Sequence, residues 1–255
     1  MKNKLGIAVA SAALLTMVSS AVFGYALLSP TRRWFPIQTP VSVGVDNGGV
    51  ASVNDASSGV NAAVAAVNAW NSGGVTVTNG SSANVSYTQG DGQSDIIFGD
   101  PRHICTGSCL AATLTGYYDT GQTGTCGGVT MVRVTDADVS FNLSYNYTTA
   151  AETTAEGGCT SEIYLESVVT HEVGHVIGLG HSSNSLALMA PTVSYCNNKM
   201  LHSDDLSGRN ALYNCNFVTG GGGGCTLGQP GASCTSNSQC CSNSCKGKPG
   251  FRTCR

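Results

Sequence analysis

Charged side chains are scarce in this chain of 255 residues. Asp, Glu, Lys and Arg make up 11% of it and leave a formal net charge of −3, whereas an average soluble protein has roughly 25% charged residues. This balance gives no reason to expect nucleic acid or an anionic membrane as a partner. Beyond the N-terminus there is also no apolar run of membrane-spanning length, so we expect no stable membrane insertion of the mature protein.

The N-terminus holds the longest apolar stretch of the sequence. Two lysines precede the apolar run Leu5–Val18, and the small residues that follow allow cleavage after Ala21 or Ala26. This pattern predicts a secretory signal peptide over residues 1–26, with an uncleaved N-terminal anchor as the alternative.

Cysteine is absent from the first 104 residues and then abundant. The twelve cysteines form two groups of six: Cys105, Cys109, Cys126, Cys159, Cys196 and Cys215, then Cys225, Cys234, Cys240, Cys241, Cys245 and Cys254. Their even number, without a pair of C-x2-C knuckles, predicts disulfides formed in an oxidising compartment rather than cysteine-bound zinc. The first group implies three bridges. We expect Cys196–Cys215 to be one of them, and the sequence leaves the others open.

A glycine-rich stretch, Thr219–Gly224, separates the two cysteine groups. It has almost no side chains to pack and should act as a flexible tether. The sequence therefore predicts a main domain over residues 27–218, a linker over 219–224 and a small cysteine-rich domain over 225–255.

The main domain has the pattern of a mixed α and β fold. Short apolar runs predict strands at Val41–Val45, Ser94–Asp100 and Gly127–Val134, and alternation predicts a half-exposed strand at Phe141–Tyr147. Apolar residues on one helical face predict a helix over Asn54–Trp70, capped by Asn54 or Asp55.

Two more helices are expected nearer the C-terminus. One begins near Thr160 or Ser161 and runs to Leu179, which places Glu162 in its first turn, where a negative charge favours the helix dipole. The other begins with Ser203 as its N-cap, followed by two aspartates.

Three of the five histidines of the chain lie within eleven residues, in "HEVGHVIGLGH". His171 and His175 are four residues apart, so a helix would place both imidazoles on one face, where they can share one ion. Gly178 and Gly180 can end that helix and turn the chain, which would bring His181 back as a third ligand.

Three nitrogen ligands with an open fourth position are typical of a catalytic zinc site. Such an ion polarises a peptide carbonyl and makes its bound water nucleophilic near neutral pH. Glu172, a quarter-turn away from His171, would take the proton of that water and deliver it to the leaving amine. The alternative is a group of solvated surface histidines without a metal.

The full string H-E-x-x-H-x-x-G-x-x-H resembles the metzincin zinc-binding signature, and "SLALMAP" resembles the Met-turn that follows it. Ser182, directly after the third histidine, makes this stretch similar to matrixins. The resemblance covers residues 34–214. It implies an α+β fold with a twisted mixed β-sheet, an active-site helix and a closing C-terminal helix. It also implies that Met189 packs beneath the zinc.

Several features depart from the matrixin pattern. The sequence has no propeptide cysteine motif such as P-R-C-G-x-P-D, and His103 and His202 do not form the pattern of a second zinc site. Five aspartates could bind calcium, although we interpret them as solvated turn carboxylates: Asp91, Asp95, Asp100, Asp136 and Asp138.

Two residues beyond the Met-turn are candidates for the substrate pocket. Pro191 stands where some metzincins have a tyrosine that reaches the zinc, and Tyr195 follows four residues later. Tyr195 can line the pocket or pack internally, and the sequence slightly favours packing.

The C-terminal cysteines, spaced C-x8-C-x5-C-C-x3-C-x8-C, resemble a knottin. That resemblance implies the pairs Cys225–Cys241, Cys234–Cys245 and Cys240–Cys254. A segment this small needs such bridges to fold. Its basic residues could bind an acidic surface, but a solvated charged face is the commoner explanation: Lys246, Lys248, Arg252 and Arg255.

These patterns together predict a secreted, monomeric zinc endopeptidase that acts on proteins or peptides. The alternative is an inactive or scaffold protein that presents a knottin as a binding or inhibitory module. The intact set of three histidines and Glu172 argues against that alternative.

Overall fold

The structure is a computed structural model that describes residues 5–8, 24–53, 56–79, 85, 88–118, 122–219, 233–239, 245–248 and 252–254. Its α-helices are α1 (Ala56–Asn68), α2 (Ala150–Glu156), α3 (Leu165–Val176) and α4 (Ser203–Tyr213), with short 3-10 helices at Pro36–Gln38 and Asn237–Gln239. Its strands are β1 (Leu5–Ala8), β2 (Ala26–Leu27), β3 (Arg32–Arg33), β4 (Val41–Val45), β5 (Val77–Asn79), β6 (Ser94–Ile97), β7 (Ala111–Tyr118), β8 (Thr123–Cys126), β9 (Val129–Phe141), β10 (Tyr147–Thr148), β11 (Ile163–Tyr164), β12 (Leu179–Gly180), β13 (Val218–Thr219), β14 (Cys245–Lys246) and β15 (Thr253–Cys254).

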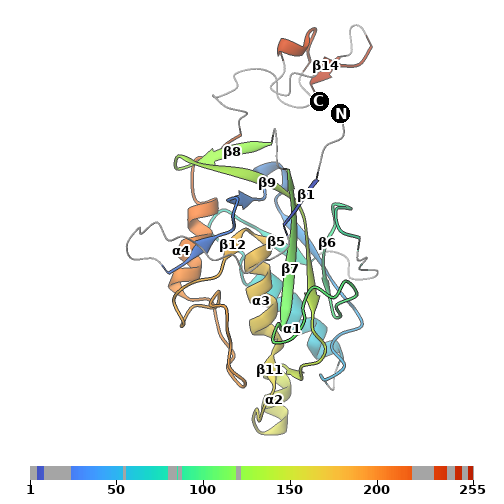
Figure 1. The fold of residues 1–255 in the computed structure, drawn as a ribbon, viewed down its shortest axis with the longest axis vertical. Coiled ribbons are helices and arrows are strands. Elements are labelled where there is room, and N and C mark those ends of the chain that lie inside the picture. Colours follow the sequence, from blue (N-terminus) through green and yellow to red (C-terminus); the bar gives the residue numbers. More distant parts are fainter. Residues whose placement is uncertain are drawn as a thin grey trace.

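A mixed sheet forms the centre of the main domain (Figure 1). Its strands follow the order β1-β7-β9-β6-β4-β5, and β3, β8 and β13 attach on the β9 side. The pairs β4–β5, β4–β6 and β6–β9 are parallel, whereas β7 is antiparallel to both β9 and β1. This mixture of strand directions, together with few helices, is the α+β architecture that the sequence predicts.

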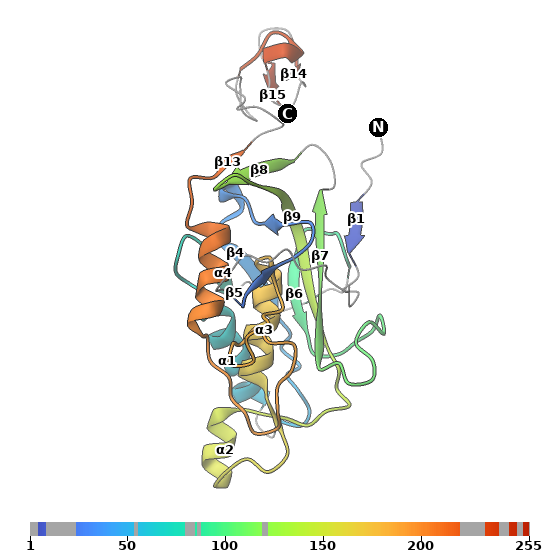
Figure 2. The same cartoon turned by 60° about the vertical axis from the view of Figure 1, so that its left-hand side comes forward.

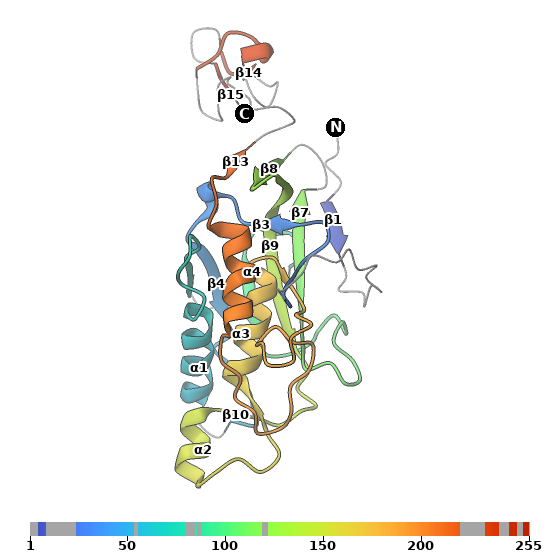
Figure 3. The ribbon, with the colours of Figure 1, turned by 90° about the vertical axis from the view of Figure 1, so that its left-hand side faces the viewer.

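The helices α1 and α3 cover one face of this sheet, with α4 on the same side (Figures 2 and 3). Their apolar faces form a buried core with the sheet, and Trp70, which follows α1, is completely buried. The indole Nε1 of Trp70 donates to the Thr170 carbonyl of α3 at 2.8 Å. Burial of such apolar surface fixes α3, and with it the histidine motif, against the sheet.

The strand Val41–Val45 matches its prediction, and α1 lies within the predicted helix. The two candidate caps, Asn54 and Asp55, lie outside the described residues. The predicted strand Gly127–Val134 overlaps β9, which begins at Val129 and continues to Phe141, whereas Gly127 and Gly128 form the turn before it. Its first residue, Val129, is exposed rather than buried.

The predicted start of the motif helix is wrong. Residues Ile163 and Tyr164 form β11, which pairs with β10, and α3 begins only at Leu165 and ends at Val176. Glu162 instead accepts hydrogen bonds from the backbone N–H groups of Thr160 and Ser161 and from the Thr160 hydroxyl. The acidic residue in the first turn of α3 is Glu166.

Two other local predictions also need correction. The segment Phe141–Tyr147 is a strand end, a turn and the start of β10, because the Asn142 side chain accepts from the Ser144 N–H at 3.0 Å and turns the chain. The cap of α4 is His202 rather than Ser203, since His202 Nδ1 accepts from the Asp204 N–H at 3.1 Å.

The main domain contains three disulfides, as its six cysteines predict, but their pairing differs. Cys196 is bonded to Cys159, and Cys215 is bonded to Cys126, so the expected Cys196–Cys215 bridge is wrong. The third bridge closes the short loop Cys105–Cys109. The pairing of the six cysteines cannot be inferred from their spacing alone.

The ends of the chain are described only in part. Residues 1–4 and 9–23 of the expected signal peptide and 220–224 of the expected linker lie outside the described residues, as do Cys225, Cys240, Cys241 and Arg255. The described residues of the expected signal peptide include β1, which pairs with β7, and Ala26 of β2, which pairs with β12. Cys234 is bonded to Cys245, which is one of the three pairs that the knottin resemblance implies. Within the described part of the chain, no helix is long and apolar enough to cross a bilayer.

Candidate metal centre

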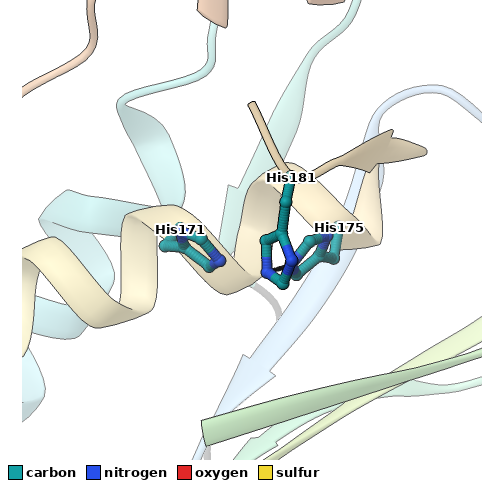
Figure 4. A group of neighbouring side chains, drawn as sticks. All are labelled: His171, His175 and His181. Carbon is teal, nitrogen blue, oxygen red and sulfur yellow. Dashed lines mark hydrogen bonds between the residues drawn. The ribbon is translucent and has the colours of Figure 1, made fainter. Parts of the chain in front are cut away.

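The three histidines of the motif converge at the end of α3 (Figure 4). His171 and His175 project from one face of the helix, and His181 reaches them from the segment after it. His175 Nε2 and His181 Nε2 are 3.2 Å apart. One nitrogen from each ring lies within 4.8 Å of the other two, so the three imidazoles could hold one metal ion.

Backbone carbonyls orient two of the rings. His171 Nδ1 lies 2.8 Å from the Leu188 carbonyl oxygen, and His175 Nδ1 lies 2.7 Å from that of Leu179. A carbonyl can only accept, so each Nδ1 carries the proton and each Nε2 keeps its lone pair. A hydrogen bond of this kind is what fixes the ring and tautomer of a metal-binding histidine.

The donor set and its spacing fit zinc. Two nitrogens bound tetrahedrally at about 2.0–2.1 Å would be roughly 3.3 Å apart, close to the 3.2 Å between His175 and His181. Burial lowers the pKa of all three histidines, to about 4 for His171 and His181. The rings are therefore neutral and able to bind a metal at neutral pH.

Gly178 makes the turn that returns His181 to the helix. Its φ of +105° is unfavourable for other residues, and a side chain there would collide with the Arg32 carbonyl. Gly180 plays a different part, since it lies in β12 and pairs with Ala26 of β2. The Leu28 N–H, which lies beyond both candidate cleavage sites, donates to the Gly178 carbonyl at 3.1 Å and helps to hold the turn before His181.

Met189 is completely buried beneath α3. Its sulfur packs against Gly174, where any side chain would collide with it. The turn around Met189 is held by Asp205 of α4, whose carboxylate accepts from the N–H groups of Leu188 and Met189 at 2.9 and 3.0 Å. Sequence reasoning assigned this aspartate only to the start of a helix and missed its role in the turn.

Its neighbour Asp204 holds the segment after His181. One carboxylate oxygen accepts from the Ser182 hydroxyl and the other from the Gly24 N–H, both at 2.7 Å. Ser182 N–H also donates to the Met189 carbonyl at 2.7 Å. The start of α4 therefore fixes both ends of the loop from His181 to the Met-turn.

Glu172 lies between the histidines and β7 and is buried, with 4% of its surface exposed. Burial raises the pKa of its carboxyl, while His175 and the Thr113 hydroxyl oppose that shift. Thr113 Oγ1 lies 2.5 Å from Glu172 Oε2. Nothing in the sequence pattern pointed to Thr113.

A cleft of about 680 Å³ opens beside these groups and is lined by His171, Glu172 and His181. Pro191 and Tyr195 also line it, and Tyr195 is 57% exposed, so the interpretation of Tyr195 as a packed residue is wrong. Lys199 also lines the cleft. Its ammonium donates to the carbonyls of Ser185, Ala187 and Thr192, which ties the wall to the Met-turn segment.

The other two histidines lie apart from this centre. His103 is an exposed loop residue with φ of +54°. His202 caps α4. Within the described part of the chain, neither belongs to a group of potential metal ligands.

The interpretation of the aspartates as solvated turn carboxylates is wrong for three of them. Asp136 and Asp138 on β9 and Asp95 on β6 are buried, whereas Asp91 is exposed. Burial raises the pKa of Asp136 to about 6 and that of Asp138 to about 8. One oxygen of Asp136 and one of Asp138 lack a hydrogen-bond partner among the described residues.

The part of the chain that holds this centre is similar to known proteins. Residues 115–214 match the matrixin family model. A segment of 83 residues is 39% identical to "Metalloendoproteinase 1" of Glycine max, covering 32% of this chain and 27% of that protein. A segment of 52 residues is 50% identical to "Matrix metalloproteinase-19" of Homo sapiens, covering 20% of this chain and 10% of that protein. The chain thus spans 27% or less of the length of these relatives.

Proposed function

Because this chain carries a matrixin-like metzincin segment over residues 115–214, we propose that it is a secreted zinc-dependent endopeptidase. The observation that carries the proposal is the orientation of the histidines. With the Nδ1 atoms of His171 and His175 bonded to carbonyls, their Nε2 lone pairs face the ring of His181. These hydrogen bonds fix the donor nitrogens of two rings, which favours metal binding by the three histidines.

His171, His175 and His181 would hold the zinc ion. When bound, zinc supplies a Lewis acid that polarises the scissile carbonyl and makes water nucleophilic near neutral pH. The Leu188 and Leu179 carbonyls keep two of the rings in place. Met189, against Gly174, forms the packed floor beneath the histidines.

Glu172 would act as general base and then as general acid. Its carboxylate accepts a proton from the attacking water and delivers it to the nitrogen of the leaving amine, so the proton balance closes within one turnover. Burial raises the pKa of this carboxyl, which helps it to hold the proton between these two steps.

The cleft suits an extended peptide as substrate. Leu110 and Ala111, at the start of β7, line it. β1, which lies within the predicted signal peptide, pairs with β7 only from Thr115 to Tyr118. Among the described strands, Ala111–Leu114 are therefore paired on the β9 side alone. A peptide could add to this free edge through main-chain hydrogen bonds. Pro191 and Tyr195, which also line the cleft, would then contact its side chains.

Export fits the chemistry of the rest of the chain. The three disulfides of the main domain are stable in an oxidising compartment, and residues 1–26 have the pattern of a signal peptide. The alternative, an inactive scaffold for the C-terminal module, has no feature of the cleft in its favour.

The test is cleavage of a protein substrate by the purified mature chain, with and without a metal chelator. Glu172→Gln should lower kcat by about 10²–10⁴-fold while the variant still binds one zinc ion. Glu156→Gln, at an exposed position of α2, is the matched control and should cleave like the wild type. Equal activity in Glu172→Gln, or an inactive wild type that contains one zinc, would contradict the proposal.

A further inference from the structure

The hydroxyl of Thr113 is the group closest to the carboxylate of Glu172. Thr113 lies in β7 opposite Val139 of β9, and it is 7% exposed. Its Oγ1 is 2.5 Å from Glu172 Oε2 and 3.2 Å from the Glu172 carbonyl oxygen. No catalytic role for this threonine follows from the histidine motif, which lies 58 residues or more along the chain.

The contact makes the two oxygens of Glu172 unequal. A hydroxyl has one proton, and the nearer and more basic acceptor is the carboxylate oxygen Oε2, so Thr113 donates there. No described residue donates a hydrogen bond to the other oxygen, Oε1. Oε2 is therefore occupied and Oε1 is available for a proton.

We propose that Thr113 is a positioning residue that holds Oε2 so that Oε1 alone accepts and returns the catalytic proton. This inference rests on the proposed peptidase function. The water gives its proton to Oε1, the Thr113 hydroxyl stays bonded to Oε2 throughout, and Oε1–H then donates the proton to the leaving nitrogen. Thr113 itself neither gains nor loses a proton.

The position favours this role over simple packing. A buried β-branched residue on a strand could be valine at no cost to packing, and valine matches threonine in shape but lacks the hydroxyl. The hydroxyl has Glu172 as its acceptor, and no other described residue bonds to it. Rigid placement of a catalytic group through such a bond is what keeps its geometry productive.

The test compares Thr113→Val, which removes the hydroxyl, with Thr113→Ser, which keeps it. We expect Thr113→Val to lower kcat by about tenfold to a hundredfold, the range for losing a hydrogen bond to a charged group, with KM within about twofold. Thr113→Ser should recover most of kcat. Thr115→Val, two residues along on the same face, removes the hydroxyl that Arg32 contacts and should cost stability rather than kcat.

Two further measurements separate positioning from a loss of structure. If Thr113 acts through Glu172, Thr113→Val should change the residual activity of Glu172→Gln by no more than about twofold. A crystal structure of metal-free Thr113→Val should show the Glu172 carboxylate rotated away from its wild-type position, a readout that needs no activity. An unchanged carboxylate together with unchanged kcat would overturn the inference, as would equal losses in Thr113→Val and Thr113→Ser.

The outcomes also distinguish this inference from the proposed function. An inactive wild type would contradict the peptidase proposal whatever Thr113 does. An active wild type that depends on Glu172 but not on the Thr113 hydroxyl would contradict only the positioning role.

Discussion

Both faces of the central sheet bury ionisable side chains, but the hydrogen bonds of these side chains are satisfied differently on the two faces. On the face covered by α3, the histidines have their Nδ1 atoms bonded to carbonyls and their Nε2 atoms facing one another. Thr113 and Val139 face this side, so alternation places Asp138 on the other one. There Asp136 and Asp138 each keep an unpartnered oxygen among the described residues.

The difference lies in what the surrounding backbone supplies. A neutral imidazole has one donor and one acceptor, and a carbonyl can satisfy the donor while leaving the acceptor free for a metal. A carboxylate has only acceptors when ionised, and burial then disfavours its charge. The histidines keep lone pairs that could bind a cation, whereas burial on the other face disfavours the charged form of Asp136 and Asp138.

The largest expected effect comes from breaking the histidine face. His175→Ala removes a ligand and should abolish zinc binding. Peptide cleavage should then fall by a thousandfold or more, because a bound ion stabilises the transition state by several kcal/mol. Zinc content by atomic spectroscopy and cleavage rate should fall together. His103→Ala, at an exposed loop position, is the control and should keep both; retention of zinc by His175→Ala would contradict the assignment.

On the other face of the sheet, replacement of Asp138 should increase the stability of the protein and leave its activity unchanged. The pKa of Asp138 in the folded protein, about 8, lies above that of an unfolded aspartate, about 3.9. The folded state then binds more protons between these values, so stability falls as pH rises from about 4 through 8. Asp138→Asn removes the charge and should stabilise the protein by about 1–3 kcal/mol at pH 8.

Urea unfolding at pH 5 and pH 8 in the presence of a chelator measures this effect. The gain should be large at pH 8 and small at pH 5. Asp91→Asn, in the same region but exposed, should give no gain at either pH. A loss of stability in Asp138→Asn at pH 8 would show that the charge is satisfied by a group not yet identified.

A smaller effect should come from the wall of the cleft next to the histidines. Lys199 ties the cleft wall to the Met-turn segment through three carbonyls. Lys199→Met keeps the length of the side chain but removes these bonds, so we expect KM for peptides to rise about threefold to tenfold with kcat little changed. Lys246→Met, in β14, is the control, and an unchanged KM in Lys199→Met would exclude the wall from substrate binding.

The smallest effect should come from the C-terminal cysteine-rich segment. Deletion of residues 225–255 leaves β13 and its pairing with β8 in place. We expect kcat/KM for a short peptide to stay within about twofold. A complete loss of cleavage by a folded, zinc-containing protein would mean that this segment contributes to the cleft.

Some of this organisation could be predicted from local patterns in the sequence. The four-residue spacing of His171 and His175 places them on one face of a helix, and the resemblance to the metzincin signature made that helix predictable. Gly178 was identified as a turn because no other residue adopts its backbone conformation without strain. These features depend on neighbours within a few residues.

Features that depend on distant contacts were not predictable. The Cys159–Cys196 bridge joins two loops that only the folded chain brings together, and the contact of Thr113 with Glu172 crosses from a strand to a helix. Asp138 is likewise buried because β9 pairs with its neighbouring strands. Its neighbours in the sequence resemble those of an aspartate in a turn, so this burial could not be predicted. Tertiary packing decided each of these cases.

X-ray absorption spectroscopy of the zinc-loaded Glu172→Gln protein tests the central claim most directly, because it reads the ligands of the ion without requiring turnover. The account predicts three imidazole nitrogens at about 2.0–2.1 Å and a fourth light atom, with the imidazole signal reduced in the double variant that also carries His181→Ala. Sulfur at about 2.3 Å, or a spectrum that His181→Ala leaves unchanged, would contradict it.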